Sequence, residues 1–175
     1  MTSSAGRRMR GNAAPAPAAR ADVVVMGGGC AGLAAALAAR ETGASVTLLE
    51  KRRSLGGTAN FIQGVFAAES EMQKRDYIAY SCEDAFRNFM EYNHWLGNAA
   101  LARALIDRSA DTIGWLQDQG VEFTEVTINM PDAPRTYHVL KGAGRGMVRA
   151  LARAAQARGV DIRVSSPVVG VLTGD

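Results

Sequence analysis

Cysteine is rare in this chain of 175 residues, which contains only Cys30 and Cys82. Two isolated cysteines provide neither a disulfide framework nor the paired spacing of a zinc site. The sequence therefore predicts a cytoplasmic protein that binds no metal.

Acidic residues are missing from the first 21 positions, which instead hold Arg7, Arg8, Arg10 and Arg20. The whole chain has 20 basic and 17 acidic side chains, so the remainder has 16 basic against 17 acidic. A nucleic-acid-binding domain carries a basic stripe of its own, and we expect no nucleic acid partner. Residues 1–21 are rich in Ala, Pro and Arg and lack apolar periodicity, which predicts a disordered tail.

A long hydrophobic run is also absent. The uncharged stretch after the tail, residues 23–39, has 17 residues including four glycines, and it is marginal for spanning a bilayer. Pro15 and Pro17 separate it from the pair Arg7–Arg8, which disfavours an export signal. We therefore expect no membrane segment.

What the chain does contain is 47% hydrophobic and 21% charged residues, as in a globular chain of one domain at this length. We expect a strand at residues 22–26, a glycine turn, a helix at 31–40 and a strand at 45–50. Strand, turn, helix and strand within about 30 residues make one βαβ unit. The pattern predicts an α/β fold with a Rossmann-like dinucleotide-binding domain.

Further elements are expected after a glycine-rich loop at residues 52–68. A helix begins after Ser81, and a longer helix spans residues 98–120 with Leu101 and Leu105 facing inward. A strand then covers residues 121–128. After a proline-bearing loop, a helix at 144–158 leads to strands at 160–164 and 168–172. The helices between residues 81 and 120 would form an insertion in the nucleotide-binding fold.

The segment 27–32, Gly-Gly-Gly-Cys-Ala-Gly, fits the pattern GxGxxG. In this pattern Gly27 permits a tight turn, Gly29 lets a diphosphate approach the backbone, and Gly32 lets helix and strand pack closely. Glu50 ends the second strand 23 residues after Gly27, where a carboxylate can bind both hydroxyls of an adenosine ribose. A glycine-rich turn with an ordinary surface glutamate is the alternative. The combination of strand, helix and acid favours a dinucleotide site.

The loop after Glu50 bears on the choice between FAD and NAD(P). It contains a second glycine pair, Gly56–Gly57, followed by Thr58 and Gly64. A plain NAD domain normally proceeds to its next helix at this point, whereas these glycines suit a backbone that passes close to a larger flat cofactor. FAD is favoured, and an NAD(P)-binding domain stays open as an alternative.

Four segments together resemble the fumarate reductase and succinate dehydrogenase flavoprotein family: residues 22–32, 48–51, 56–58 and 142–151. The similarity extends over residues 22–175. Membrane-complex members of that family attach FAD through a histidine before the glycine pair, and no histidine occurs between Glu50 and Phe66. The resemblance therefore implies FAD that is bound non-covalently. The cofactor-binding residues that it implies are Gly27, Gly28, Gly29, Cys30, Ala31, Gly32, Glu50, Lys51, Gly57, Thr58, Ala59, Gly64 and Val168.

The family's chain is considerably longer, so we expect residues 22–175 to be the N-terminal part of an FAD-binding domain, truncated before the capping domain that binds substrate. In a complete enzyme the resemblance implies hydride transfer through the flavin, to or from an alkene- or alkane-type small molecule. No catalytic residue is expected within this chain. An inactive fragment or a weak nucleotide-binding module remains the alternative.

Other conspicuous residues have ordinary structural interpretations. Cys30 is either a reactive thiol or a small residue that fits beside a diphosphate, and the second is favoured. His94 is expected at the surface near a helix end. Residues 135–138 are expected in a loop, where Arg135 or His138 either touches flavin or substrate or is solvated. Three aromatic residues near the start of the helical insertion are expected in the core: Phe86, Phe89 and Trp95.

Overall fold

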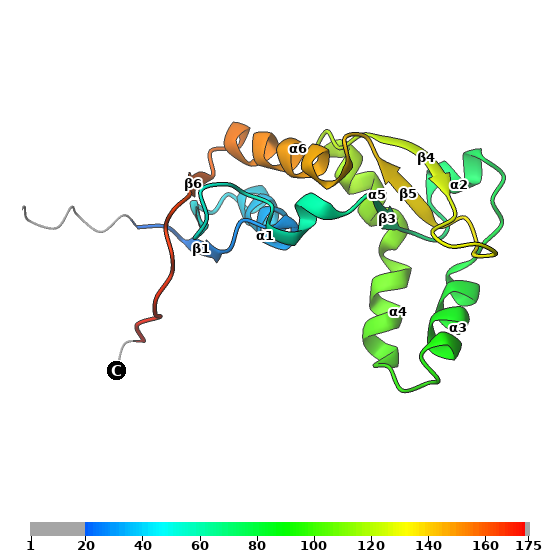
Figure 1. Cartoon of the computed structure of the whole chain (residues 1–175). Coiled ribbons are helices and arrows are strands. Elements are labelled where there is room, and N and C mark those ends of the chain that lie inside the picture. Colours follow the sequence, from blue (N-terminus) through cyan, green and yellow to red (C-terminus); the bar gives the residue numbers. More distant parts are fainter. Residues whose placement is uncertain (1–19, 174–175) are drawn as a thin grey trace, which may run out of the picture.

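The computed structural model describes residues 20–173. It is a mixed α/β structure with one parallel and one antiparallel sheet, each of three strands (Figure 1). All but the last two residues of the predicted disordered tail, 1–21, lie outside the described residues.

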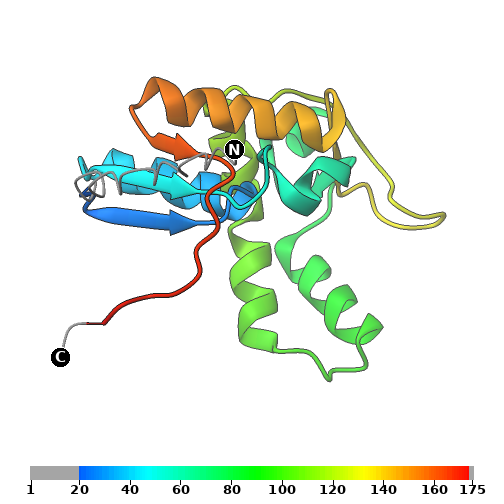
Figure 2. The same cartoon turned by 60° about the vertical axis from the view of Figure 1, so that its left-hand side comes forward.

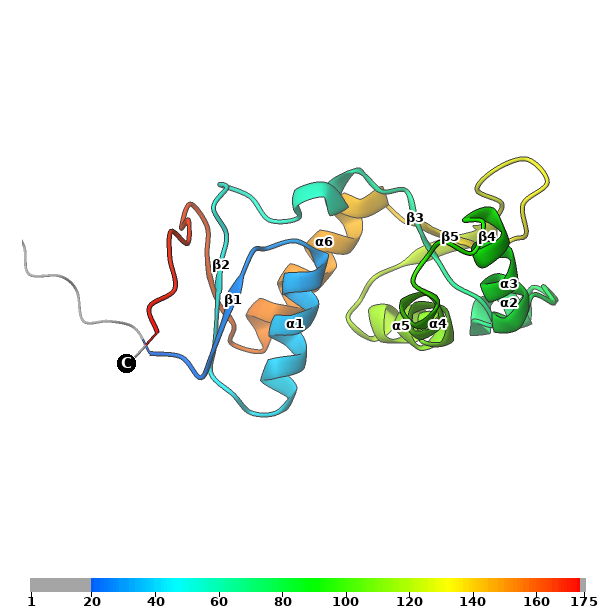
Figure 3. The same ribbon diagram turned by 90° about the horizontal axis from the view of Figure 1, so that it is seen from below.

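The parallel sheet has the order β1-β2-β6. Its strands are β1 (Val23–Met26), β2 (Val46–Leu49) and β6 (Asp161–Arg163). Helix α1 (Cys30–Glu41) follows β1, and helix α6 (Ala143–Ala157) precedes β6. The two helices pack against each other and lie side by side in Figures 2 and 3.

The main core lies between this sheet and the two helices. Leu33 and Leu37 of α1, Leu48 of β2 and Leu151 of α6 are almost fully buried there. The other face of β1 is open, since Met26 is 60% exposed. The burial of one face alone shows that α1 and α6 cover the same side of the sheet.

The antiparallel sheet has the order β3-β5-β4 and was only partly predicted. Strand β4 (Phe123–Thr127) matches the expected strand at 121–128, whereas β3 (Gly64–Phe66) and β5 (Tyr137–Leu140) lie in segments expected to be loops. Gly64 pairs with Val139 in the sheet. The prediction of a loop at residues 135–138 is therefore wrong for its last two residues.

The helical insertion projects from the rest as a hairpin of α3 (Cys82–Tyr92) and α4 (Ala99–Asp107) (Figure 1). The expected helix at 98–120 is divided at Arg108, and α5 (Ser109–Asp118) forms its second half. Leu101 is 67% and Leu105 is 60% exposed, so their predicted inward orientation is wrong. The burial is contributed instead by Ala102 and Ile106, on the other side of α4.

Two further expectations need correction. Residues 168–172 form no strand; they pair with no strand of the described chain and run away from the body (Figure 1). Phe89 and Trp95 are exposed rather than in the core, while Phe86 is half-buried beneath the guanidinium of Arg103. The structure also contains a short helix that was not predicted, α2 (Glu71–Arg75).

No helix within residues 20–173 is both long enough and apolar enough to cross a membrane.

Candidate functional site

The glycine turn joins β1 to α1 with the geometry expected from its sequence. Gly27 has a φ of 103°, a left-handed conformation that favours glycine. Its N–H donates to the Leu49 carbonyl at 2.8 Å, which ties the turn to the end of β2. A Cβ on Gly32 would collide with the Gly27 carbonyl oxygen, so the close packing expected of this glycine is present.

The N-terminal end of α1 has no side-chain cap. Gly29 is the N-cap and offers no side chain, and the first helical bond runs from the Leu33 N–H to the Gly29 carbonyl at 2.9 Å. The amides of Cys30, Ala31 and Gly32 therefore have no partner within the helix. Together with the positive end of the helix dipole, they form a site suited to an anion such as a diphosphate.

Glu50 is buried beside this turn, with 7% of its surface exposed. Its Oε2 accepts the Gly28 N–H at 2.7 Å and its Oε1 accepts the Arg52 N–H at 2.8 Å. These N–H groups of Arg52 and Gly28 hold the pKa of the Glu50 carboxyl below its ordinary value, so the group is ionised at neutral pH. Each carboxylate oxygen retains further acceptor capacity for a ligand hydroxyl.

The second glycine pair lies directly against the first turn. The Gly56 N–H donates to the Gly28 carbonyl at 2.7 Å, and Gly29 forms an isolated parallel bridge with Gly56. Gly56 has a φ of 108°, and the Asn60 side chain fills the space where its Cβ would stand. The structure thus brings the glycine turn, Glu50 and the second glycine pair to one place.

The other predicted cofactor residues lie farther along the chain in more varied surroundings. Thr58 is exposed and Ala59 is buried, both in the 3-10 helix η1 (Gly57–Phe61). The Ala59 carbonyl is in contact with Gly144 of α6, so this residue also joins η1 to the core. Lys51 is exposed, and Val168 is 41% exposed in the extended C-terminal segment.

The end of β6 and the residues directly after it also border the site, and none of these contacts was predicted from the sequence. The Glu50 N–H donates to the Arg163 carbonyl, and the Ser166 N–H donates to the Glu50 carbonyl at 2.8 Å. Ser165 donates in the same way to the carbonyl of Arg52. These are backbone contacts between segments more than 100 positions apart, and no local pattern of side chains encodes them.

His138 was a candidate for contact with flavin or substrate, and the structure places it in a closed environment. The ring is fully buried, and its Nε2 lies 2.6 Å from the Ser70 Oγ. Its Nδ1 lies 3.1 Å from the Thr136 carbonyl, which accepts a hydrogen bond from it. Burial lowers the pKa of the His138 imidazole, so the ring is neutral at pH 7. The histidine joins β5 to the start of α2, and His94 is exposed as expected.

Comparison with known proteins indicates a dinucleotide cofactor, as the geometry of the site does. Residues 22–175 match the family model described as an FAD binding domain. The chain is 39% identical to a vinyl phenol reductase of Lactiplantibacillus plantarum over 87% of its length, and 34% identical to a fumarate reductase (cytochrome) of Shewanella frigidimarina over 93%. It covers 32% and 29% of those two proteins.

Among solved structures, the open conformation of a flavocytochrome c3 fumarate reductase superposes with a TM-score of 0.79 at 26% identity. The match covers 88% of this chain and 28% of that one. The chain belongs to the FAD-binding domain family, within the fumarate-reductase-like flavoprotein oxidoreductases. Its cofactor is FAD.

Proposed function

We propose that residues 22–175 form the N-terminal part of a Rossmann-like FAD-binding domain in a flavoprotein that transfers hydride to or from an alkene- or alkane-type substrate. In this proposal the segment from Gly27 to Gly32 binds the diphosphate of FAD, and Glu50 binds the adenosine ribose. The remaining contacts come from Lys51, Gly57, Thr58, Ala59, Gly64 and Val168.

The arrangement of Glu50 is the observation that carries the proposal. A buried, ionised carboxylate is costly unless hydrogen bonds compensate it. Here two backbone N–H groups do so, and they hold the carboxylate next to the unpaired amides of α1. One site therefore offers donors for phosphate oxygens and an acceptor for hydroxyl groups, which matches the adenosine diphosphate half of FAD.

The residues of this chain supply binding and orientation. When bound, FAD supplies the acceptor and donor of the hydride, and the protein controls its position and its electrostatic surroundings. The segment between Glu50 and Phe66 has no histidine, so we propose that the flavin is held without a covalent bond. Acid precipitation of reconstituted protein should release all of the flavin into the supernatant.

Reconstitution tests the proposal. The chain is incubated with FAD, separated by gel filtration, and the flavin absorbance that elutes with folded protein is measured. We expect about one flavin per chain. If no flavin co-elutes while NAD raises the melting temperature, the site belongs to an NAD(P)-binding domain instead.

A second candidate is a nucleotide-binding fragment without turnover. It is favoured by the coverage of the relatives, because the chain spans about a third of their length. Supplying reduced flavin with fumarate or 4-vinylphenol separates the two: the fragment hypothesis predicts FAD binding without substrate reduction, whereas reduction of either compound would overturn it.

A further inference from the structure

A groove lined by arginines lies between the segment 52–61 and helix α6. Its volume is about 640 Å3, and its lining includes Arg52, Arg53, Arg145 and Arg149. No Asp or Glu lines it, and no carboxylate within residues 20–173 forms an ion pair with these four side chains. Four uncompensated cations in one hollow create a positive potential that attracts anions.

Both walls of the groove contribute cations. Arg145 and Arg149 are four residues apart on α6, a spacing at which like charges repel each other across one turn of a helix. Arg52 and Arg53 face them from the loop that follows Glu50. Arg149 also borders a neighbouring hollow with Arg153, in which Lys141 is paired with Glu122.

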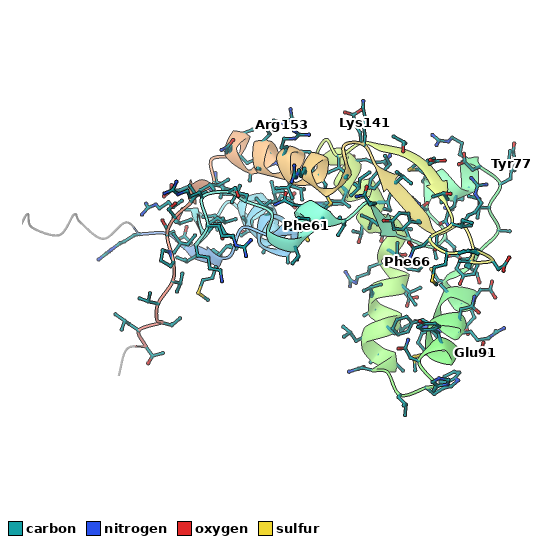
Figure 4. All side chains as sticks on the ribbon, viewed as in Figure 1. Phe61, Phe66, Tyr77, Glu91, Lys141 and Arg153 are labelled. Atoms are coloured by element: carbon teal, nitrogen blue, oxygen red, sulfur yellow. The ribbon has the colours of Figure 1, made fainter. Side chains whose placement is uncertain are left out.

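The groove also has apolar side chains in its lining. Leu55, Val148, Ala152 and Val164 line it, and so does Phe61, which is 73% exposed. Figure 4 labels Phe61 on η1, below α6. An exposed aromatic ring can stack on a nucleobase, and guanidinium groups bind phosphate oxygens in a fork. The volume is that of a small-molecule site.

This groove is separate from the glycine turn. Of the residues proposed to bind FAD, it shares only Gly57. Gly27 to Gly32 and Glu50 do not line it, so a ligand here would not compete with the diphosphate of FAD. The loop 52–57 lies between the two sites.

We propose that this groove binds a nucleoside diphosphate, with its phosphates at the arginines and its base at Phe61 and Leu55. The site would add a second nucleotide to the FAD-loaded protein. The inference does not rest on the proposed roles of Gly27 to Gly32 and Glu50, because it uses other side chains.

Calorimetric titration of ADP into the FAD-saturated chain tests the inference. We expect one ADP per chain, an affinity that falls with added salt, and at least tenfold weaker binding in the double variant Arg53→Gln/Arg145→Gln. The control is Arg153→Gln, which removes one positive charge from α6 outside the groove and should bind ADP within about twofold of wild type. Circular dichroism confirms that each variant is folded.

Absence of ADP binding to the folded wild-type chain would overturn the proposal. Equal affinities in the double variant and in wild type would overturn it as well, because the ligand would then lie elsewhere. If the chain fails to retain FAD, the titrations are performed without it; ADP then also fits the glycine turn, so we expect two ADP per chain, of which the double variant loses one. The arginine variants leave the glycine turn intact, so a loss of ADP binding in them still assigns the ligand to the groove.

Discussion

At the scale of single residues, Glu50 combines two roles in one side chain. Its carboxylate fixes the glycine turn through the Gly28 N–H and fixes the following loop through the Arg52 N–H. The position of Glu50 at the end of β2 was predicted from the sequence. The sequence did not predict that the N–H groups of Gly28 and Arg52 donate to this carboxylate, because these hydrogen bonds exist only in the folded turn.

The lowered pKa of Glu50 makes its contribution to stability depend on pH. A carboxyl with a depressed pKa stabilises the fold fully above its ordinary value of 4.5, and this contribution is lost as the pH falls through the lower pKa of the folded state. Melting temperatures should therefore decrease on acidification more steeply in wild type than in Glu50→Gln. Parallel decreases in the two proteins would show that Glu50 does not titrate in this way.

Gly32 should be intolerant of any side chain. An added Cβ meets the Gly27 carbonyl oxygen, a backbone atom that cannot move aside, so Gly32→Ala should lower the free energy of unfolding by about 1–3 kcal/mol. Gly114→Ala is the control, because this helical glycine has open space around its Cβ position and should gain about 0.5–1 kcal/mol. Urea denaturation measures both. Equal effects would contradict the close packing of β1 and α1.

At the scale of elements, most segments encoded by local pattern were predicted, although α2 was missed despite its capping box, and strands held by distant contacts were not. The β1–α1–β2 unit has apolar strands, a glycine turn and a helix-stopping Gly43, all visible in the sequence. Strand β3 has three residues, and it exists because β5 pairs with it from more than 70 positions away. The predicted strand at 168–172 lacks such a partner within the described residues.

The capping boxes of α2 and α3 allow a matched comparison. Ser70 and Ser81 each accept the N–H of the residue three positions later, but only Ser70 is buried against His138. Ser81→Ala should cost about 1 kcal/mol, the usual value of an N-cap. Ser70→Ala should cost about 2–4 kcal/mol, because it also leaves the buried His138 Nε2 without its donor. Thermal or chemical denaturation measures the difference, and equal costs would argue against a structural role for the histidine.

At the scale of the whole molecule, large apolar side chains are exposed at two places. Tyr92, Leu96, Leu101 and Leu105 are all at least 60% exposed on or next to the α3–α4 hairpin, and one face of the parallel sheet is open at Met26. Large exposed apolar patches mark surfaces that other protein covers. This surface was not predicted, because Leu101 and Leu105 of α4 were expected to face inward.

Self-association through the hairpin is therefore expected. The double variant Leu101→Gln/Leu105→Gln should shift the mass in light scattering towards the monomer while leaving the melting temperature nearly unchanged, because both side chains are already exposed. Ile106→Gln, on the buried side of the same helix, should instead lower the melting temperature. A wild-type chain that is monomeric at all concentrations would contradict this expectation.

The FAD affinity of Gly29→Ser tests the central claim most directly. A Cβ at Gly29 meets nothing closer than 3.8 Å, and serine is a favoured N-cap, so the fold should keep its stability. The new hydroxyl would nevertheless occupy the amides that the diphosphate needs. Measured by flavin fluorescence, the variant should bind FAD at least tenfold more weakly than wild type at an unchanged melting temperature. Equal affinity in the two proteins would show that the glycine turn does not bind the cofactor.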